Sequence, residues 1–84
     1  MIYSIDFEPI AVRQFRKLES VIRKKLLPKI KALAKNPRPP GTKKLQGFKN
    51  RYRIRVGDYR VVYQIHDKIL LVLIVEIGHR SDVY

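Results

Sequence analysis

Six consecutive residues in the second half of the chain, Arg51 to Val56, alternate arginine with apolar side chains. Successive side chains of a β-strand point to opposite faces, so the three arginines share one face and the apolar residues share the other. Gly57-Asp58 follows, and a two-residue turn that opens with glycine is favoured in tight hairpins. Such a turn places Arg55 opposite Arg60 on the next strand. The same register pairs Val56 with Tyr59, Ile54 with Val61 and Tyr52 with Tyr63. The segment therefore predicts a hairpin with one core face and one cationic face.

The cationic face belongs to a longer basic stretch. From residue 20 to residue 57 the chain carries thirteen lysines and arginines and no aspartate or glutamate, and its formal net charge is +12. Like charges that lie opposite each other across two strands are destabilising, so the pairing of Arg55 with Arg60 favours an anion site over a purely structural hairpin. A surface of this kind suits a polyphosphate or an acidic partner. For Arg51 alone, a solvated side chain remains an open alternative.

Length and composition limit the remaining possibilities. A chain of 84 residues has room for one small domain, which we expect to span residues 1–84. Because it has no cysteine, it can form neither a disulfide nor a thiolate metal site, which fits a reducing compartment and predicts the cytoplasm. Its first residues lack the pattern of a secretion signal, and no apolar run approaches the roughly 18 residues of a membrane span, so no membrane partner is expected.

In the first half of the chain the apolar residues recur at helical spacing, and in the second half they recur at every second position. Pro9 suits the first turn of a helix over residues 9–18, and a second helix runs from Ser20, its expected N-cap, to about Lys35. Pro28 is expected to kink this helix without dividing it. Strands are predicted at 2–7, 51–56, 59–66 and 69–77. The order β-α-α-β-β-β predicts an α+β fold, in which a two-helix hairpin packs on a small, mostly antiparallel, twisted sheet.

Three segments resemble the RelE/ParE superfamily of bacterial and archaeal toxins. They are Lys44-Leu45-Gln46-Gly47, the hairpin from Tyr52 to Tyr63, and the end of the chain from Ile77 to Tyr84. The predicted order of elements is also that of the superfamily, and the resemblance covers essentially the whole chain. For the RelE branch, it implies a ribosome-dependent endoribonuclease that cuts messenger RNA in the ribosomal A site. It also implies a cognate antitoxin that keeps the toxin silent.

The resemblance further implies roles for individual residues. Arg53 and Arg55 stand where the branch has two basic residues on the first hairpin strand, and Arg60 stands at its phosphate-contacting arginine. Arg80 stands at its catalytic arginine and Tyr84 at its near-terminal tyrosine. The predicted catalytic residues are thus Arg55, Arg60, Arg80 and Tyr84, with Arg51 and Arg53 as RNA-binding residues. The best-known pattern of the branch has lysines at the positions of Arg53 and Arg55. Since a guanidinium is a poorer proton acceptor than an amine, catalysis here must depend more on positioning and charge.

RNA cleavage by a ribose 2′-OH requires removal of a proton, protonation of the leaving 5′-oxygen and stabilisation of negative charge on phosphorus. The sequence offers no carboxylate pair, metal cluster or Ser/His/Asp set, so arginines are the available groups, and we expect neither cofactor nor metal. His79 could act as an acid or base, contact RNA or have no role, and we group it with the RNA-binding residues. Lys43, Lys44 and Lys49 either contact RNA or are loop charges without a role.

Three functions remain open at this point. The endoribonuclease is favoured, because gyrase-directed ParE-like members of the superfamily generally do not retain the full arginine set together with Tyr84. The alternatives are a ParE-like inhibitor of DNA gyrase without ribonuclease activity and a non-catalytic module that binds RNA or the ribosome. The expected partners are messenger RNA, ribosomal RNA in the A site, and an antitoxin with an acidic binding segment.

Overall fold

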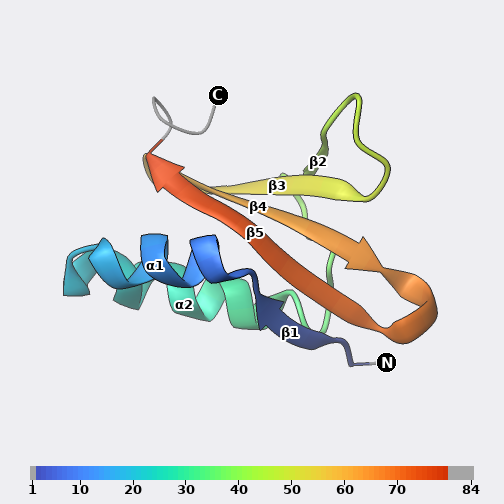
Figure 1. Cartoon of the computed structure of the whole chain (residues 1–84), viewed down its shortest axis with the longest axis horizontal. Helices are drawn as coiled ribbons and strands as arrows, with labels where there is room; N and C mark the ends of the chain where they lie inside the picture. The colour runs from blue at the N-terminus through green and yellow to red at the C-terminus, as the bar shows by residue number, and fades with distance from the viewer. Residues whose placement is uncertain (1, 80–84) are drawn as a thin grey trace.

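The computed structural model describes residues 2–79, which fold into two layers (Figure 1). One layer is a five-stranded sheet of order β1-β5-β4-β3-β2, in which β1 is parallel to β5 and all other neighbours are antiparallel. Helix α1 packs against β5 and β1 and helix α2 against β3, so the two helices form the second layer, against one face of the sheet. The elements are β1 (Ser4–Phe7), α1 (Pro9–Lys17), α2 (Ser20–Ala32), β2 (Lys43–Lys44), β3 (Arg51–Val56), β4 (Tyr59–His66), a 3-10 helix η1 (Asp67–Ile69) and β5 (Leu71–His79). The predicted α+β fold is confirmed, with β2 as an additional short edge strand.

Helix α2 differs from the prediction at both ends. It begins at Ser20 as its first helical residue, because Glu19 has the extended conformation of the N-cap, so the prediction of Ser20 as the N-cap was wrong. The helix continues through Pro28, as predicted. Pro28 lies on the exposed side, where water can bond the carbonyl that the proline leaves without its helical donor. The helix ends at Ala32, short of Lys35, because the following turn tightens to 3-10 hydrogen bonds.

The β3–β4 hairpin has the register that its sequence predicts. Arg55 lies opposite Arg60, Val56 opposite Tyr59, Ile54 opposite Val61 and Tyr52 opposite Tyr63. The turn at Gly57 has a φ of +60°, a left-handed conformation that glycine adopts without steric cost. The hairpin is therefore a local consequence of alternation and turn chemistry.

Two irregularities set the path of β5. Asp67–Ile69 form the 3-10 helix and Leu70 is left-handed with a φ of 51°, so β5 begins at Leu71 instead of at residue 69. A β-bulge at Val62/Tyr63 then shifts the register between β4 and β5. Because of this shift, Ile74 before the bulge and Ile77 after it both belong to the core, although they lie three positions apart and would otherwise face opposite sides of the sheet.

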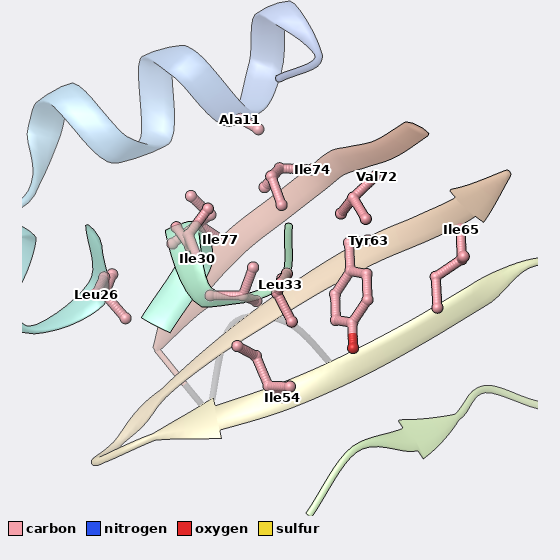
Figure 2. Close-up of a cluster of buried hydrophobic side chains, with 11 residues drawn as sticks. Ala11, Leu26, Ile30, Leu33, Ile54, Tyr63, Ile65, Val72, Ile74 and Ile77 are labelled. Atoms are coloured by element: carbon pink, nitrogen blue, oxygen red, sulfur yellow. The ribbon is translucent and has the colours of Figure 1, made fainter. Parts of the chain in front are cut away.

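The core fills the space between the helices and the sheet. Figure 2 shows side chains from both helices and from β3, β4 and β5 converging on it. Leu26, Ile30 and Leu33 contribute from the second helical segment, and Tyr63 is fully buried at the sheet. The hydroxyl of Tyr63 donates a hydrogen bond of 2.7 Å to the carbonyl oxygen of Pro37, and burial raises the pKa of this hydroxyl. The helix-facing side of the sheet is thus fully used for packing, which leaves the opposite side for other functions.

An arginine–aspartate pair fastens the connector between α2 and β2 to the rest of the fold. Nη2 of Arg38 lies 3.0 Å from Oδ2 of Asp67 and 3.3 Å from the hydroxyl oxygen of Tyr52, and its guanidinium stacks 5.1 Å from the Tyr52 ring centroid. The hydroxyl of Tyr3 donates a hydrogen bond of 2.6 Å to Oδ1 of Asp67. These two donors hold the pKa of the Asp67 carboxyl below its usual range, while the bond to Asp67 raises the pKa of Tyr3. We call this group of four residues the clasp.

None of the helices within residues 2–79 is long and apolar enough to cross a membrane.

Candidate functional site

The sheet face turned away from the helices carries a row of arginines. On β3, Ile54 is buried in the core, and Tyr52 and Val56 pack against it. The alternating positions Arg51, Arg53 and Arg55 therefore lie on the opposite face. Arg60 joins them from β4, directly opposite Arg55. We call Arg51, Arg53, Arg55 and Arg60 the arginine face.

Strand β2 extends this face at the sheet edge. Lys43 lies opposite Arg53 in the antiparallel register, so its side chain falls on the same side of the sheet. Side chains that face each other in this way have Cβ atoms about 4.5–5.5 Å apart. Three strands therefore contribute Lys43, Arg53, Arg55 and Arg60 to one neighbourhood.

Two shallow depressions adjoin these side chains. The first, of about 300 Å³, is lined by Lys43, Lys44, Leu45, Gln46, Arg53 and Arg60. The second, also of about 300 Å³, is lined by Pro40, Gly41, Lys43, Arg53, Ile54 and Arg55. Lys43 and Arg53 line both, so they form the boundary between two cationic hollows. No carboxylate is among the lining residues within the described part of the chain, which makes both hollows suited to anions.

The three arginines that line or adjoin the depressions differ in burial. Arg55 is exposed, Arg53 and Arg60 are half-buried, and the Nε atom of Arg60 is fully buried. On its other side Arg60 lies opposite Gly78 of β5, a residue without a side chain that could cover it. Arg60 therefore combines a buried Nε with a neighbouring position on β5 where no side chain covers it.

The structure does not bring His79 together with the arginine face. His79 lies opposite Tyr59, and the two rings meet edge to face with centroids 5.5 Å apart. Tyr59 packs against the core, so His79 lies on the helix side, in a depression that Gln14, Leu18 and Glu76 also line. The β-bulge explains this position, because without the shifted register residue 79 would face the arginines.

The remaining predicted residues occupy the edge of the site or lie outside the described residues. Lys44 lines the first depression, although in register it faces Tyr52. Lys49 is exposed in the loop between β2 and β3, beyond both depressions. Arg51 lies at the far end of the arginine face, next to the same loop. Arg80 and Tyr84 lie outside the described residues, which end at His79.

Several residues of this neighbourhood were not predicted from the sequence. Pro40 and Gly41 line the second depression and Gln46 lines the first, which could not be foreseen without knowing where the connector runs. Phe48 is half exposed, and the guanidinium of Arg51 lies 4.6 Å from its ring centroid. An aromatic residue set among lysines and arginines was the available signal for Phe48.

This arrangement can bind and stabilise a phosphodiester. Guanidinium groups stay protonated at physiological pH, and their planar donors match phosphate oxygens. Donors fixed in advance around a reacting phosphate also lower the energy of a more highly charged transition state. Within residues 2–79 no group of three or more His, Cys, Asp or Glu side chains is placed to hold a metal ion. Charge stabilisation by arginine is thus the chemistry that the described residues support.

Comparison with known proteins identifies the family. Residues 5–84 match the family model described as ParE toxin of type II toxin-antitoxin system, parDE. The chain belongs to this toxin family. The mRNA interferase toxin RelE of Escherichia coli (strain K12) is 35% identical to it over 88 residues, and the alignment covers 100% of this chain and 92% of that protein.

Solved structures of RelE proteins have the same fold as this toxin. A free-state structure of Escherichia coli toxin RelE with two arginine-to-alanine substitutions superposes with a TM-score of 0.84 at 32% identity, covering 99% of this chain and 88% of that one. RelE in the intact Escherichia coli RelBE toxin-antitoxin complex gives a TM-score of 0.82 at 33% identity. The superposition covers 92% of this chain and 95% of that one. These similarities place the toxin on the RelE branch of the RelE/ParE superfamily.

Proposed function

We propose that this type II toxin, as a single domain over residues 1–84, cleaves messenger RNA on the ribosome. The observation that carries the proposal is the convergence of Lys43, Arg53, Arg55 and Arg60 from three strands on one face. The relative named an mRNA interferase toxin, which aligns with the whole chain, supports it. Action on the ribosome places the toxin in the cytoplasm.

The proposed reaction is an in-line transesterification. The 2′-oxygen of one nucleotide attacks the adjacent phosphorus, the P–O5′ bond breaks, and the proton lost from the 2′-OH is balanced by one gained at the 5′-oxygen. The products are a 2′,3′-cyclic phosphate and a 5′-OH. Between them lies a pentavalent phosphorus with an added negative charge, which is the species that a cationic face stabilises best.

Each arginine has a distinct role in this reaction. Arg60, whose Nε is buried, binds the scissile phosphate together with Arg80. Arg55, directly opposite Arg60, adds charge at the same phosphate, and Arg53 binds the neighbouring one. Tyr84 stacks on a base of the RNA, a common means of holding unpaired nucleotides. Lys43 and Lys44 of β2, Lys49 of the following loop, and Arg51 at the end of the row bind the RNA on either side.

The proton transfers are the difficult part for such a site. A guanidinium with a pKa above ~12 is almost never free to accept a proton near neutral pH. The toxin therefore contributes mainly charge stabilisation, and the ribosome contributes alignment of the 2′-OH with the scissile bond. Alignment of this kind can lower a barrier by ~7–11 kcal/mol, which is large enough to make catalysis depend on the ribosome.

An antitoxin is the second proposed partner. RelE of Escherichia coli has been crystallised in a complex with its antitoxin, and RelE of Pyrococcus horikoshii OT3 in a complex with RelB. We propose that the antitoxin of this toxin places an acidic segment over the arginine face. Thirteen basic residues without one acidic residue between positions 20 and 57 give such a segment a complementary surface.

The family model that matches is named for ParE, so inhibition of DNA gyrase is the alternative function. Two assays separate the alternatives. The toxin is added to a reconstituted translation reaction, and primer extension locates breaks in the message. It is also added to a gyrase supercoiling reaction. Breaks within ribosome-occupied codons with unchanged supercoiling support the proposal, whereas intact message with inhibited supercoiling would overturn it.

A further inference from the structure

Phe48 is the one aromatic side chain within residues 2–79 that is classed as exposed, with 50% of its surface accessible to solvent. It lies in the loop between β2 and β3, beside Lys49 and three residues before Arg51. Leaving a phenylalanine in water forgoes the ~1.5–3 kcal/mol that its burial could contribute, so a ligand that covers the ring would recover part of this free energy.

Arg51 is already stacked on this ring. Its guanidinium carbon lies 4.6 Å from the centroid of Phe48, within the range of a cation–π contact. Arg51 is only half-buried, so the pair offers an aromatic ring and a planar cation at one surface. Both groups are known surfaces for stacking nucleic-acid bases.

The loop that carries the pair is fastened at both of its ends. The N–H of Leu45 donates a hydrogen bond of 2.9 Å to the carbonyl oxygen of Arg51. The N–H of Ile65 on β4 donates one of 3.0 Å to the carbonyl oxygen of Asn50. Because these bonds hold the loop in place, binding a base on Phe48 does not require the loop to be ordered first.

We propose that Phe48 and Arg51 form a stacking platform for an unpaired base of the RNA strand that lies along the arginine face. This proposal rests on the proposed ribonuclease function and adds a second contact to it, at Arg51, four residues along β3 from Arg55 at the phosphate site. Alternate residues of a strand are ~6.6 Å apart, so Arg51, Arg53 and Arg55 form an evenly spaced row of cations for consecutive phosphates of one strand. An RNA strand that runs along this row away from Arg60 reaches Phe48, where one of its bases can stack on the ring.

The charge around the platform favours RNA over an apolar partner. Lys49 is adjacent, the arginine face begins at Arg51, and no acidic residue occurs between positions 20 and 57. A hydrophobic protein segment would gain an apolar contact with one ring only, and its binding would remove water from several cations. A nucleotide gains both the stacking surface and the charge.

The test uses the full-length toxin and a short single-stranded RNA with 2′-O-methyl groups, so that it cannot be cleaved, and one 2-aminopurine base. Stacking quenches the fluorescence of this base, and anisotropy of an end label gives the affinity. Phe48→Leu keeps an apolar side chain but removes the ring, Phe48→Tyr keeps the ring, and Ile69→Ala removes exposed apolar surface elsewhere.

Phe48→Leu is expected to lose at least fivefold in affinity and most of the quenching at one position of the probe base, with an unchanged salt slope because no charge is removed. Phe48→Tyr and Ile69→Ala should behave as the wild type. Equal affinity and quenching for wild type and Phe48→Leu would overturn the platform, as would a wild type that leaves the probe unquenched. So would a Phe48→Leu variant that binds RNA normally but binds its antitoxin less tightly.

The binding assay does not depend on cleavage. Loss of quenching in Phe48→Leu would support the platform even if the wild type left messages intact, in which case the ribonuclease function alone would fall. Conversely, a toxin that cuts messages while Phe48→Leu binds the probe normally would retain its function and lose the platform.

Discussion

Arg55 and Arg60 lie directly opposite each other across the β3–β4 hairpin. Two like charges in this position repel each other, at a cost within the ~0.2–1 kcal/mol typical of cross-strand pairs. Folding alone does not require either charge, since the hairpin is already specified by its core face and its turn. The pair is therefore best understood as a functional feature that reduces the stability of the fold.

The first prediction is that relieving this repulsion stabilises the free toxin. Arg55→Gln should raise the free energy of unfolding by roughly 0.2–1 kcal/mol in urea titrations at low salt, with a smaller gain at high salt because of screening. Lys24→Gln, on the exposed surface of α2, is the matched control and should change stability less. A destabilised Arg55→Gln protein would show that the pair is not repulsive in the fold.

A second prediction concerns acid stability, which depends on the clasp. The pKa of Asp67 is lower in the folded state than in the unfolded chain, so the native state binds fewer protons at acidic pH. The stability that Asp67 contributes is present above the unfolded pKa of ~4 and is lost as the pH falls through the folded value. Asp67→Asn should therefore flatten the decline of melting temperature as the pH falls below the unfolded pKa of ~4.

The measurement for Asp67→Asn is a series of thermal unfolding curves followed by circular dichroism. Asp58→Asn, in the hairpin turn, is the control for removing one negative charge from the same strongly basic protein. The clasp account would be wrong if both variants followed the same pH profile, since only Asp67 is bonded to Arg38 and Tyr3.

A third prediction follows from the buried hydroxyl of Tyr63. Tyr63→Phe removes the hydrogen bond to the carbonyl oxygen of Pro37 and leaves that oxygen without its donor. The expected loss is about 1–2 kcal/mol in the free energy of unfolding. Because Pro37 leads into the connector that lines the second depression, RNA affinity should fall as well. Unchanged stability in urea titrations would show that the oxygen finds another donor.

Much of the fold could be predicted from local patterns. The hairpin register follows from two-residue alternation on both sides of Gly57-Asp58, and the start of α1 follows from Pro9. The location of Arg53, Arg55 and Arg60 on one face follows from the same register. Such features depend on neighbours in the sequence, which is why sequence patterns were sufficient for them.

The features that could not be predicted depend on distant contacts or on single-residue shifts. The bulge at Val62/Tyr63 moved His79 to the helix side, and no residue type marks a bulge at that position. Because Asp67–Ile69 form a 3-10 helix, β5 begins two residues later than predicted. The hydrogen bond between Arg38 and Asp67 joins residues 29 positions apart. Strand β2 has only two residues and forms because the connector lies beside Arg53 and Tyr52.

If guanidinium groups of the arginine face stabilise the phosphorus centre during RNA cleavage, removing the Arg60 side chain should slow the reaction strongly. The measurement is the rate of message cleavage in a reconstituted translation reaction, followed by primer extension, for wild type, Arg60→Ala and the control Lys24→Ala. The proposal predicts at least ~100-fold slower cleavage for Arg60→Ala with a native circular dichroism spectrum, and at most a small, salt-sensitive loss for Lys24→Ala. Cleavage by Arg60→Ala at the wild-type rate would contradict it.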